Sequence, residues 1–263
     1  SMAYDTVKKW DTVKADETSP SQAFVGLIHN IIPVQPRDKV LDSSAASFFN
    51  HMHNKFILEA ATRGWLDENF NGVKERGEVK SYMAGKLDWL GVNYYTRVVI
   101  KSKFSPIAYI LIKTWKLPEI VPGYGLACEP NSVSRDGRPT SDFGWEVYPE
   151  GIRQALKLAS KYSDYIIVTE NGIADKEDKL RPRFIRDHLE QVKLAIEEDK
   201  IPVKGYLHWS LVDNYEWAHG FKMKFGLYAV NLETKERIPR KKSIEVLSKI
   251  TSEGFDALTH ISV

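Results

Sequence analysis

Short apolar runs alternate along the chain with longer segments of helical periodicity. The apolar runs have the length and the β-branched or aromatic content of buried parallel strands, and they lie at residues 24–28, 89–95, 165–168 and 206–209. Apolar residues that recur every three or four positions predict helices at residues 44–62, 150–161, 181–198 and 243–253. This alternation of strands and helices predicts an α/β fold with a parallel sheet.

The spacing of these elements limits the architecture. A complete eight-stranded α/β barrel takes about 250 residues, or roughly 31 for each strand and helix. The predicted strands begin near residues 24, 89, 165 and 206, which leaves room for only four such units. We therefore expect a single domain over 1–263, either half of a barrel with long loops or an open four-stranded sheet. The interval 101–142 is expected to be a long loop with an apolar tip at 108–112.

Composition narrows the classes of partner. The chain has 37 Lys and Arg against 35 Asp and Glu, a net charge of +2, which is too small for a nucleic-acid-binding surface. We expect no nucleic acid partner, no membrane partner and a cytoplasmic location, since no long apolar segment is present. No Cys/His cluster and no glycine-rich phosphate loop follow the strands, so we expect no metal and no cofactor. A basic run at 237–242 is typical of solvated surface.

A carboxylate stands at the end of the third predicted strand. Glu170 follows the apolar run directly, and the carboxyl ends of strands are where α/β barrels carry their catalytic groups. Glu170 is therefore the strongest single catalytic candidate. The alternative is that it merely ends a strand before an Asn-Gly turn.

Two further segments carry polar and aromatic side chains in a small space. The stretch 205–217 combines a strand end with two Trp, two carboxylates and an Asn, the mixture that a carbohydrate pocket uses. In the stretch 89–97, Asn93 and Tyr95 lie on one face of a strand, and Tyr94 lies on the other. The alternative is that the two Trp only pack against the end of a barrel.

Four segments in order resemble glycoside hydrolase family 1, in particular its archaeal β-galactosidases and β-glucosidases. They are Thr-Glu-Asn-Gly at 169–172, Leu-Gly-Val-Asn-Tyr-Tyr at 90–95, the Trp-to-Trp stretch at 209–217, and Phe-Gly-Trp-Glu-Val-Tyr-Pro-Glu-Gly at 143–151. The resemblance begins near residue 3 in what is similar to the fourth helix of the family and runs almost to residue 263. It implies the carboxyl-terminal half of a TIM barrel, with strands five to eight.

The resemblance also implies roles for individual residues. Glu170 would be the nucleophile of a retaining β-glycosidase, with Tyr95 hydrogen-bonded to it and Asn93 in the same polar shell. The residues implied in sugar binding are Trp209 as the floor, Glu216 and Trp217 at the hydroxyls, Phe225 at the apolar edge and Trp145 toward the leaving group. Family members that act on phosphorylated sugars have Ser in place of Glu216, so unphosphorylated glycosides are expected.

The sequence differs from the family in one catalytic group, because it lacks the acid/base. A retaining glycosidase needs two carboxylates, and the family's second is the Glu of an Asn-Glu-Pro motif, which this sequence does not contain. The resemblance therefore implies a chain that is inactive alone. A separately encoded amino-terminal half, a second copy of the chain or rearranged helices could cover the open barrel edges, although a second copy would supply no acid. The alternative is a non-catalytic, truncated relic or a structural subunit of a split enzyme.

Overall fold

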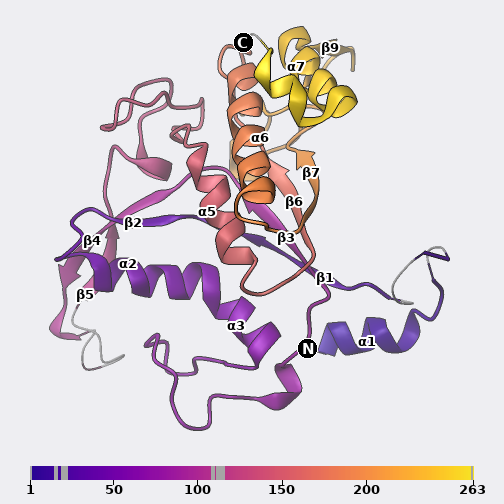
Figure 1. The fold of residues 1–263 in the computed structure, drawn as a ribbon. Helices are drawn as coiled ribbons and strands as arrows, with labels where there is room; N and C mark the ends of the chain where they lie inside the picture. Colours follow the sequence, from indigo (N-terminus) through magenta and orange to yellow (C-terminus); the bar gives the residue numbers. More distant parts are fainter. Residues whose placement is uncertain (1, 15–16, 19–22, 108–109, 111–115, 262) are drawn as a thin grey trace.

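The main sheet contains four parallel strands. The computed structural model describes all residues except 1, 15–16, 19–22, 108–109, 111–115 and 262. The strands run side by side in the order β1 (Gly26–Asn30), β3 (Trp89–Tyr94), β6 (Ile166–Asn171) and β7 (Val203–His208) (Figure 1). Every neighbouring pair is parallel. The predicted parallel sheet is thus confirmed, and each predicted apolar run overlaps one of its strands.

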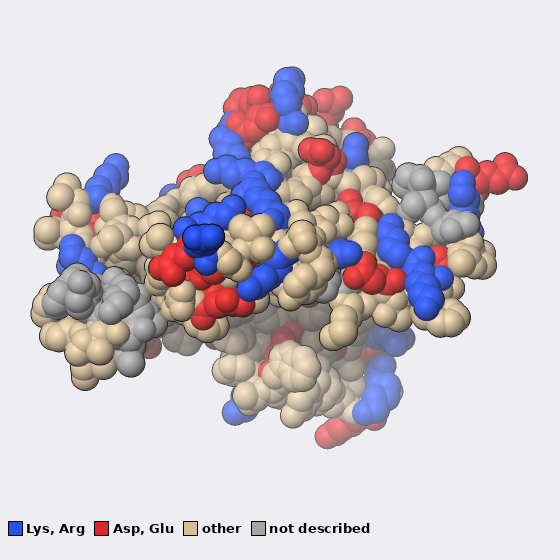
Figure 2. All heavy atoms as spheres, turned by 90° about the horizontal axis from the view of Figure 1, so that it is seen from below, with Lys and Arg blue, Asp and Glu red and all other residues tan. Residues whose placement is uncertain are grey.

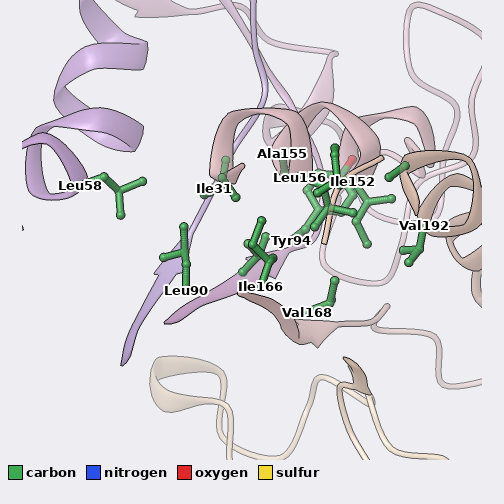
Figure 3. Close-up of a cluster of buried hydrophobic side chains, with 14 residues drawn as sticks. Ile31, Leu58, Leu90, Tyr94, Ile152, Ala155, Leu156, Ile166, Val168 and Val192 are labelled. Atoms are coloured by element: carbon green, nitrogen blue, oxygen red, sulfur yellow. The ribbon is translucent and has the colours of Figure 1, made fainter. Parts of the chain in front are cut away.

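Helices cover one face of this sheet. The helices α5 (Glu150–Ala159) and α6 (Arg181–Glu197) lie against it, and both confirm their predicted positions (Figure 1). Strand residues that point toward them are fully buried and share one apolar cluster with helix residues, labelled in Figure 3 as Leu90, Tyr94, Ile166, Val168, Ile152, Leu156 and Val192. Burial of these side chains is the main force that holds the helices on the sheet.

The opposite face of the sheet is partly open. On this face, Ile28 of β1 is 53% exposed and Leu207 of β7 is 58% exposed. Gly91 of β3 lies beside Ile28, and a Cβ there would stand 2.8 Å from Ile28 and 2.9 Å from Thr169, so a larger residue would displace one of them. Parallel sheets normally have both faces covered, so this face is unusual for a parallel sheet.

The helix predicted at 44–62 is interrupted. It forms α2 (Ser43–Asn50), a π-helical turn (His51–Lys55) and α3 (Phe56–Arg63). The buried side chain of Asn54, in the wide turn, accepts a hydrogen bond from the Ile32 amide at 2.9 Å and donates one to the Ile32 carbonyl at 2.7 Å. The turn therefore fixes the helix to the chain that follows β1.

The interval expected to be a long loop contains strands. A second sheet has the order β2 (Val34–Pro36), β4 (Val98–Phe104) and β5 (Lys116–Ile120), in which β4 and β5 are antiparallel. The loop prediction was wrong here because Lys101 and Lys103 break the apolar pattern of β4, and Pro118 lies within β5, where it pairs with Ser102. Apart from Ile110, the apolar tip at 108–112 lies outside the described residues.

The remaining elements lie at the ends of the chain and in the loops. The predicted last helix is confirmed as α7 (Lys241–Glu253). The others are α1 (Met2–Trp10), the antiparallel strands β8 (Tyr228–Val230) and β9 (Arg237–Pro239), and the 3₁₀ turns η2 (Ser81–Met83), η3 (Gly125–Ala127), η4 (Trp217–His219) and η5 (Gly254–Thr259).

Charges of both signs are mixed on the surface. On the face seen in Figure 2, acidic and basic side chains lie next to one another over much of the molecule, in keeping with the small net charge. Among the residues that the structure describes, no helix has the length and apolar character needed to cross a bilayer.

Candidate active site

The ends of β3 and β6 bring a phenol and a carboxylate together. Tyr95, directly after β3, donates a 2.6 Å hydrogen bond to Oε2 of Glu170 in β6. Burial, this hydrogen bond and the charge of Glu170 all raise the pKa of Tyr95. The phenol thus remains a proton donor at neutral pH and fixes one carboxylate oxygen.

Asn93, the other polar residue predicted near the end of β3, lies opposite Glu170. Asn93 accepts a 2.7 Å hydrogen bond from the hydroxyl of Thr169 through its side-chain oxygen. The pairing of β3 with β6 shifts its register between Val92 and Asn93, which places Asn93 opposite Glu170. Asn93 and Tyr95 therefore lie on the same face of the sheet, as the alternation of the strand predicts.

Asn171 joins three strands behind Glu170. Its buried side-chain amide donates to the carbonyl of Tyr94 at 2.9 Å, and its side-chain oxygen accepts from the phenol of Tyr206 at 2.9 Å. Its own carbonyl accepts from the amide of Trp209 at 2.9 Å. One residue thus fixes the ends of β3, β6 and β7 relative to one another.

The glycine after Asn171 allows close contact with the next strand end. A Cβ on Gly172 would lie 1.7 Å from the carbonyl oxygen of Trp209, so no other residue fits without displacing β7. The peptide bond between Trp209 and Ser210 is cis. The Thr-Glu-Asn-Gly segment and the Trp209 segment are therefore held in contact.

The carboxylate of Glu216 is held by two donors. The indole of Trp209 donates to its Oε1 at 3.3 Å, and the Asn214 amide donates to the same oxygen at 2.9 Å. The negative charges of Glu170 and Glu216 both raise the pKa of Tyr95, since all three groups lie in one region. Glu216 therefore belongs to the same constellation as Glu170.

The other carboxylate of the 205–217 stretch has a structural role. Asp213 is buried and forms a bidentate pair with Arg240 at 3.0 and 3.2 Å, and it also accepts from the Gly226 amide at 2.9 Å. Asp213 therefore has no free oxygen directed at a ligand. The expectation that the basic run at 237–242 is solvated surface is wrong for Arg240. Arg240 is buried, and its charge neutralises that of Asp213.

Aromatic rings form a wall beside Glu170. The ring of Tyr95 lies 5.3 Å from that of Trp145 and 6.0 Å from that of Phe225, which is buried. Phe143 stacks on Trp145 at 4.2 Å. Two of the predicted sugar-binding aromatics are therefore grouped with the Tyr95–Glu170 pair.

A buried ion pair holds Trp145 at this position. Arg97 donates to both oxygens of Glu146, at 2.8 and 3.0 Å, and Glu146 also accepts from the Ser134 hydroxyl at 2.7 Å and the Gly125 amide at 2.9 Å. Because Arg97 follows the Tyr95 segment and Glu146 follows Trp145, the pair connects the two segments. Glu146 lies within the 143–151 segment and Arg97 lies two residues after the 90–95 segment, so their adjacency to Trp145 and Tyr95 was the signal available in the sequence.

One predicted site residue lies outside the cluster. Trp217 is 86% exposed and extends from the loop after β7. Sequence reasoning also missed several residues that orient the cluster, namely Asn171, Tyr206, Asn214, Arg97, Glu146 and Thr169. Apart from the adjacency that marks Arg97 and Glu146, their roles depend on contacts between distant segments, which the order of residues does not reveal.

The predicted site lies beside the open face of the main sheet. A pocket of about 10 Å³ borders Tyr95, Trp145 and Gly172, whereas a cavity of about 1000 Å³ lies elsewhere, between the start of α6, the β8–β9 hairpin and α7, and contains none of the predicted site residues. The described part of the chain contains no group of three His, Cys, Asp or Glu side chains that could hold a metal ion. A deep ligand pocket beside Glu170 would require walls on the open face of the sheet.

Comparisons with known proteins agree on one family. The chain is 46% identical over 257 residues to a β-galactosidase of Pyrococcus woesei, covering 96% of this chain and 49% of that protein. It is 40% identical over 264 residues to a β-galactosidase of Saccharolobus solfataricus, covering 99% of this chain and 48% of that protein. The crystal structure of the β-glycosidase from Thermosphaera aggregans has a TM-score of 0.78 at 37% identity, over 99% of this chain and 49% of that one.

The chain spans about half the length of the curated relatives that it matches. Residues 5–254 match glycosyl hydrolase family 1. The chain therefore belongs to glycosyl hydrolase family 1.

Proposed function

We propose that this chain is the nucleophile-bearing half of a retaining β-glycosidase that acts on unphosphorylated sugars. The observation that carries the proposal is the 2.6 Å hydrogen bond from Tyr95 to Glu170 at the carboxyl end of the parallel sheet, beside an aromatic wall. This is the edge at which α/β barrels carry their catalytic groups. The activity is of the β-galactosidase or β-glucosidase type for which the relatives are named.

In the proposed reaction Glu170 attacks the anomeric carbon of the glycoside. The bond to the leaving group breaks, and a covalent glycosyl-enzyme forms with inversion at that carbon. Water then opens this ester with a second inversion, so the configuration is retained overall. Tyr95 holds one oxygen of Glu170, which directs the other toward the sugar, and Asn93 fixes the neighbouring Thr169.

The sugar would be held by the residues around Glu216. Trp209 would form the floor under the sugar ring, because aromatic faces pack on the C–H surfaces of sugars. Glu216, oriented by Trp209 and Asn214, would accept hydrogen bonds from two hydroxyls. Phe225 and Trp145 would form the apolar edge and the leaving-group side. The carboxylate of Glu216 disfavours a phosphate at this position, which supports unphosphorylated substrates.

The proposed architecture is half of a TIM barrel, strands five to eight. The four parallel strands and the match to about half of each relative support it. Since the sequence contains no Asn-Glu-Pro motif, the chain alone would lack the acid/base and would not hydrolyse ordinary glycosides. A complete barrel would require an amino-terminal half of the family. A second copy of this chain could also close the barrel but would supply no acid/base.

A substrate with an activated leaving group tests whether the chain supplies the nucleophile and lacks the acid/base. A dinitrophenyl β-glycoside needs no acid assistance, because its leaving group is already a weak base. We expect a burst of one dinitrophenol per chain, followed by slow turnover that azide accelerates, because azide attacks the glycosyl-enzyme without a general base. The product would be the β-glycosyl azide, which reports double inversion.

The matched control for this experiment is Glu170→Gln, which retains the shape of the side chain and removes the nucleophile. The burst should disappear in this variant. No burst in the wild-type chain, with folding verified by circular dichroism, would favour a non-catalytic relic or structural subunit. A burst that persists in Glu170→Gln would assign the nucleophile to another carboxylate, of which Glu216 is the nearest candidate.

A further inference from the structure

A large cavity lies away from the Glu170 cluster. Its volume is about 1000 Å³, and its walls come from the start of α6, the β8–β9 hairpin and α7 (Figure 1). We propose that this cavity binds an organic anion, namely a phosphate ester with an apolar body. The proposal concerns a second site and does not depend on the function proposed for Glu170.

The lining of the cavity has an excess of basic residues. Among the residues that the structure describes, eight Lys or Arg and four Asp or Glu line it. The whole chain has 37 basic and 35 acidic residues, so the rest of the chain is close to neutral and the excess is concentrated here. A concave surface with charges of one sign raises the local concentration of ligands of the opposite sign.

Three of the four acidic residues in the lining are already neutralised by cations. These pairs are Asp213 with Arg240 and Lys224, Asp178 with Arg181, and Glu245 with Lys249. The fourth acidic residue, Glu177, is exposed, where water and salt screen its charge. An anion that enters the cavity therefore meets little uncompensated negative charge.

Four lysines supply the positive charge that remains. They line the cavity, are exposed and form no ion pair with another described residue, and they are Lys176, Lys179, Lys241 and Lys242. Lys224 and Lys249, in the same cavity, are paired. A phosphate monoester carries a charge of about −1.5 to −2 at pH 7 and three acceptor oxygens, so one such group can bind several lysines.

The start of α7 adds partial positive charge beside two of these lysines. The first amides of a helix have no acceptor in the helix itself, and Arg240, which precedes α7, provides no side-chain cap. The first turn contains no acidic residue, and Lys241 and Lys242 are its first two residues. The start of α6 differs, because Asp175 accepts hydrogen bonds from two backbone amides there. An anion beside Lys241 and Lys242 would thus also interact favourably with the helix dipole of α7.

Apolar side chains line another part of the cavity. Val246 and Ile261 are buried, Ile238 of β9 is 49% exposed, and Ala229 and Val230 of β8 are half-buried. Pockets that hold organic ligands have volumes of about 300 to 1000 Å³. Inorganic phosphate would leave most of this cavity unfilled, which favours a phosphate ester whose apolar body covers Ile238.

Calorimetric titration with 1-naphthyl phosphate tests the proposal. The wild-type chain is titrated at low ionic strength with this probe, with inorganic phosphate and with neutral 1-naphthol. We expect one naphthyl phosphate per chain, bound at least about tenfold more tightly than either of the other two, because only this probe combines the charge with an apolar body. Equal affinity for inorganic phosphate would refute the role of the apolar part, and equal affinity for 1-naphthol would refute an anion site.

Paired substitutions locate the site. Lys241→Gln/Lys242→Gln should weaken the binding of naphthyl phosphate at least about tenfold, because it removes two charged donors. The matched control, Lys39→Gln/Lys74→Gln, removes the same charge from exposed lysines outside the cavity and should change the affinity by less than about twofold. Ile238→Ser should also weaken the binding, since it removes apolar contact area.

Circular dichroism and thermal melts verify that each variant folds. Absence of binding to the folded wild-type chain, or equal effects of the two double substitutions, would overturn the proposal. No glycoside is present in these titrations, so their outcome is independent of whether Glu170 is a nucleophile.

Discussion

The phenol of Tyr95 donates a 2.6 Å hydrogen bond to the carboxylate of Glu170, two residues that are 75 positions apart in the sequence. The bond joins the ends of β3 and β6 on the face of the sheet that the helices leave open. It gives Glu170 a fixed orientation in the isolated chain. Orientation of a nucleophile before substrate binds is a major part of enzymatic rate enhancement.

Removal of the Tyr95 hydroxyl tests this orientation. Tyr95→Phe keeps the ring against Trp145 and Phe225 but removes the hydrogen bond to Glu170. We expect the dinitrophenol burst to become at least about tenfold slower, since loss of one oriented donor commonly costs that much or more. Stopped-flow absorbance measures the burst. An unchanged burst rate in a folded variant would show that Tyr95 has no role in orientation.

Asn171 should be a determinant of stability as well as geometry. Asn171→Ala removes two side-chain hydrogen bonds in a fully buried place. The Tyr94 carbonyl loses this donor, and the Tyr206 phenol retains only a 3.4 Å contact with Nδ1 of His208. We expect a loss of about 2 to 3 kcal/mol in the free energy of unfolding, measured by urea titration. The control Asn69→Ala, in an exposed hydrogen bond to Glu75, should change it by less than about 0.5 kcal/mol. Equal effects of the two substitutions would refute the role of Asn171.

Removal of one partner of the buried Arg97–Glu146 ion pair should lower the free energy of unfolding. Arg97→Met leaves Glu146 buried and uncompensated, and we expect destabilisation of about 3 to 5 kcal/mol. The double variant Arg97→Met/Glu146→Leu should recover part of this loss, because it removes both charges. Lys249→Met, which breaks the exposed pair with Glu245, should cost no more than about 0.5 kcal/mol. If the double variant is no more stable than Arg97→Met, an uncompensated charge is not the cause.

Two histidines, the buried His188 and the half-buried His208, predict a loss of stability in acid. Burial lowers the pKa of His188 from 6.5 to about 4, and burial together with the charges of Arg181 and His188 lowers that of His208 to about 3. The unfolded chain binds these protons near pH 6.5 and the folded chain only at a lower pH. The stabilisation is therefore fully present above about pH 6.5 and is lost progressively as the pH falls from 6.5 to the folded pKa values. His188 alone should contribute a decrease of about 3 kcal/mol from pH 7 to pH 4.

Urea unfolding at several pH values measures this effect. His188→Gln should flatten the pH dependence between pH 6.5 and pH 4, whereas His260→Gln, at an exposed histidine, should leave it unchanged. A wild-type chain that is equally stable at pH 7 and pH 4 would contradict the prediction.

The alternation of apolar runs and helical periodicity was sufficient to predict the main sheet. Residues such as Leu90, Val92 and Val168 are buried against the helices, so their apolar character reports burial directly. The second sheet could not be predicted in this way, because β4 has polar positions and β5 contains Pro118. Pairing of β2 with β4 joins segments about 60 residues apart and depends on contacts that a local pattern does not contain.

The sequence was sufficient to predict which candidate site residues lie on the same face of the sheet, because side chains alternate between the two faces along a strand. Glu170, Asn93 and Tyr95 lie together for that reason. The two carboxylates of the 205–217 stretch could not be separated, because only the fold shows that Asp213 binds Arg240 while Glu216 binds Trp209. Trp217 follows Glu216 in sequence but lies in solvent, since the loop after β7 turns at that residue.

The central claim, that Glu170 is the nucleophile, is tested most directly by trapping. The folded chain is incubated with a dinitrophenyl 2-deoxy-2-fluoro-β-glycoside, whose fluorine slows hydrolysis of the glycosyl-enzyme, and the peptides are sequenced by mass spectrometry. We predict one added fluoro-sugar on the peptide that contains Glu170, and none in Glu170→Gln. A label on Glu216 or on any other residue, or no label on the folded chain, would contradict the claim.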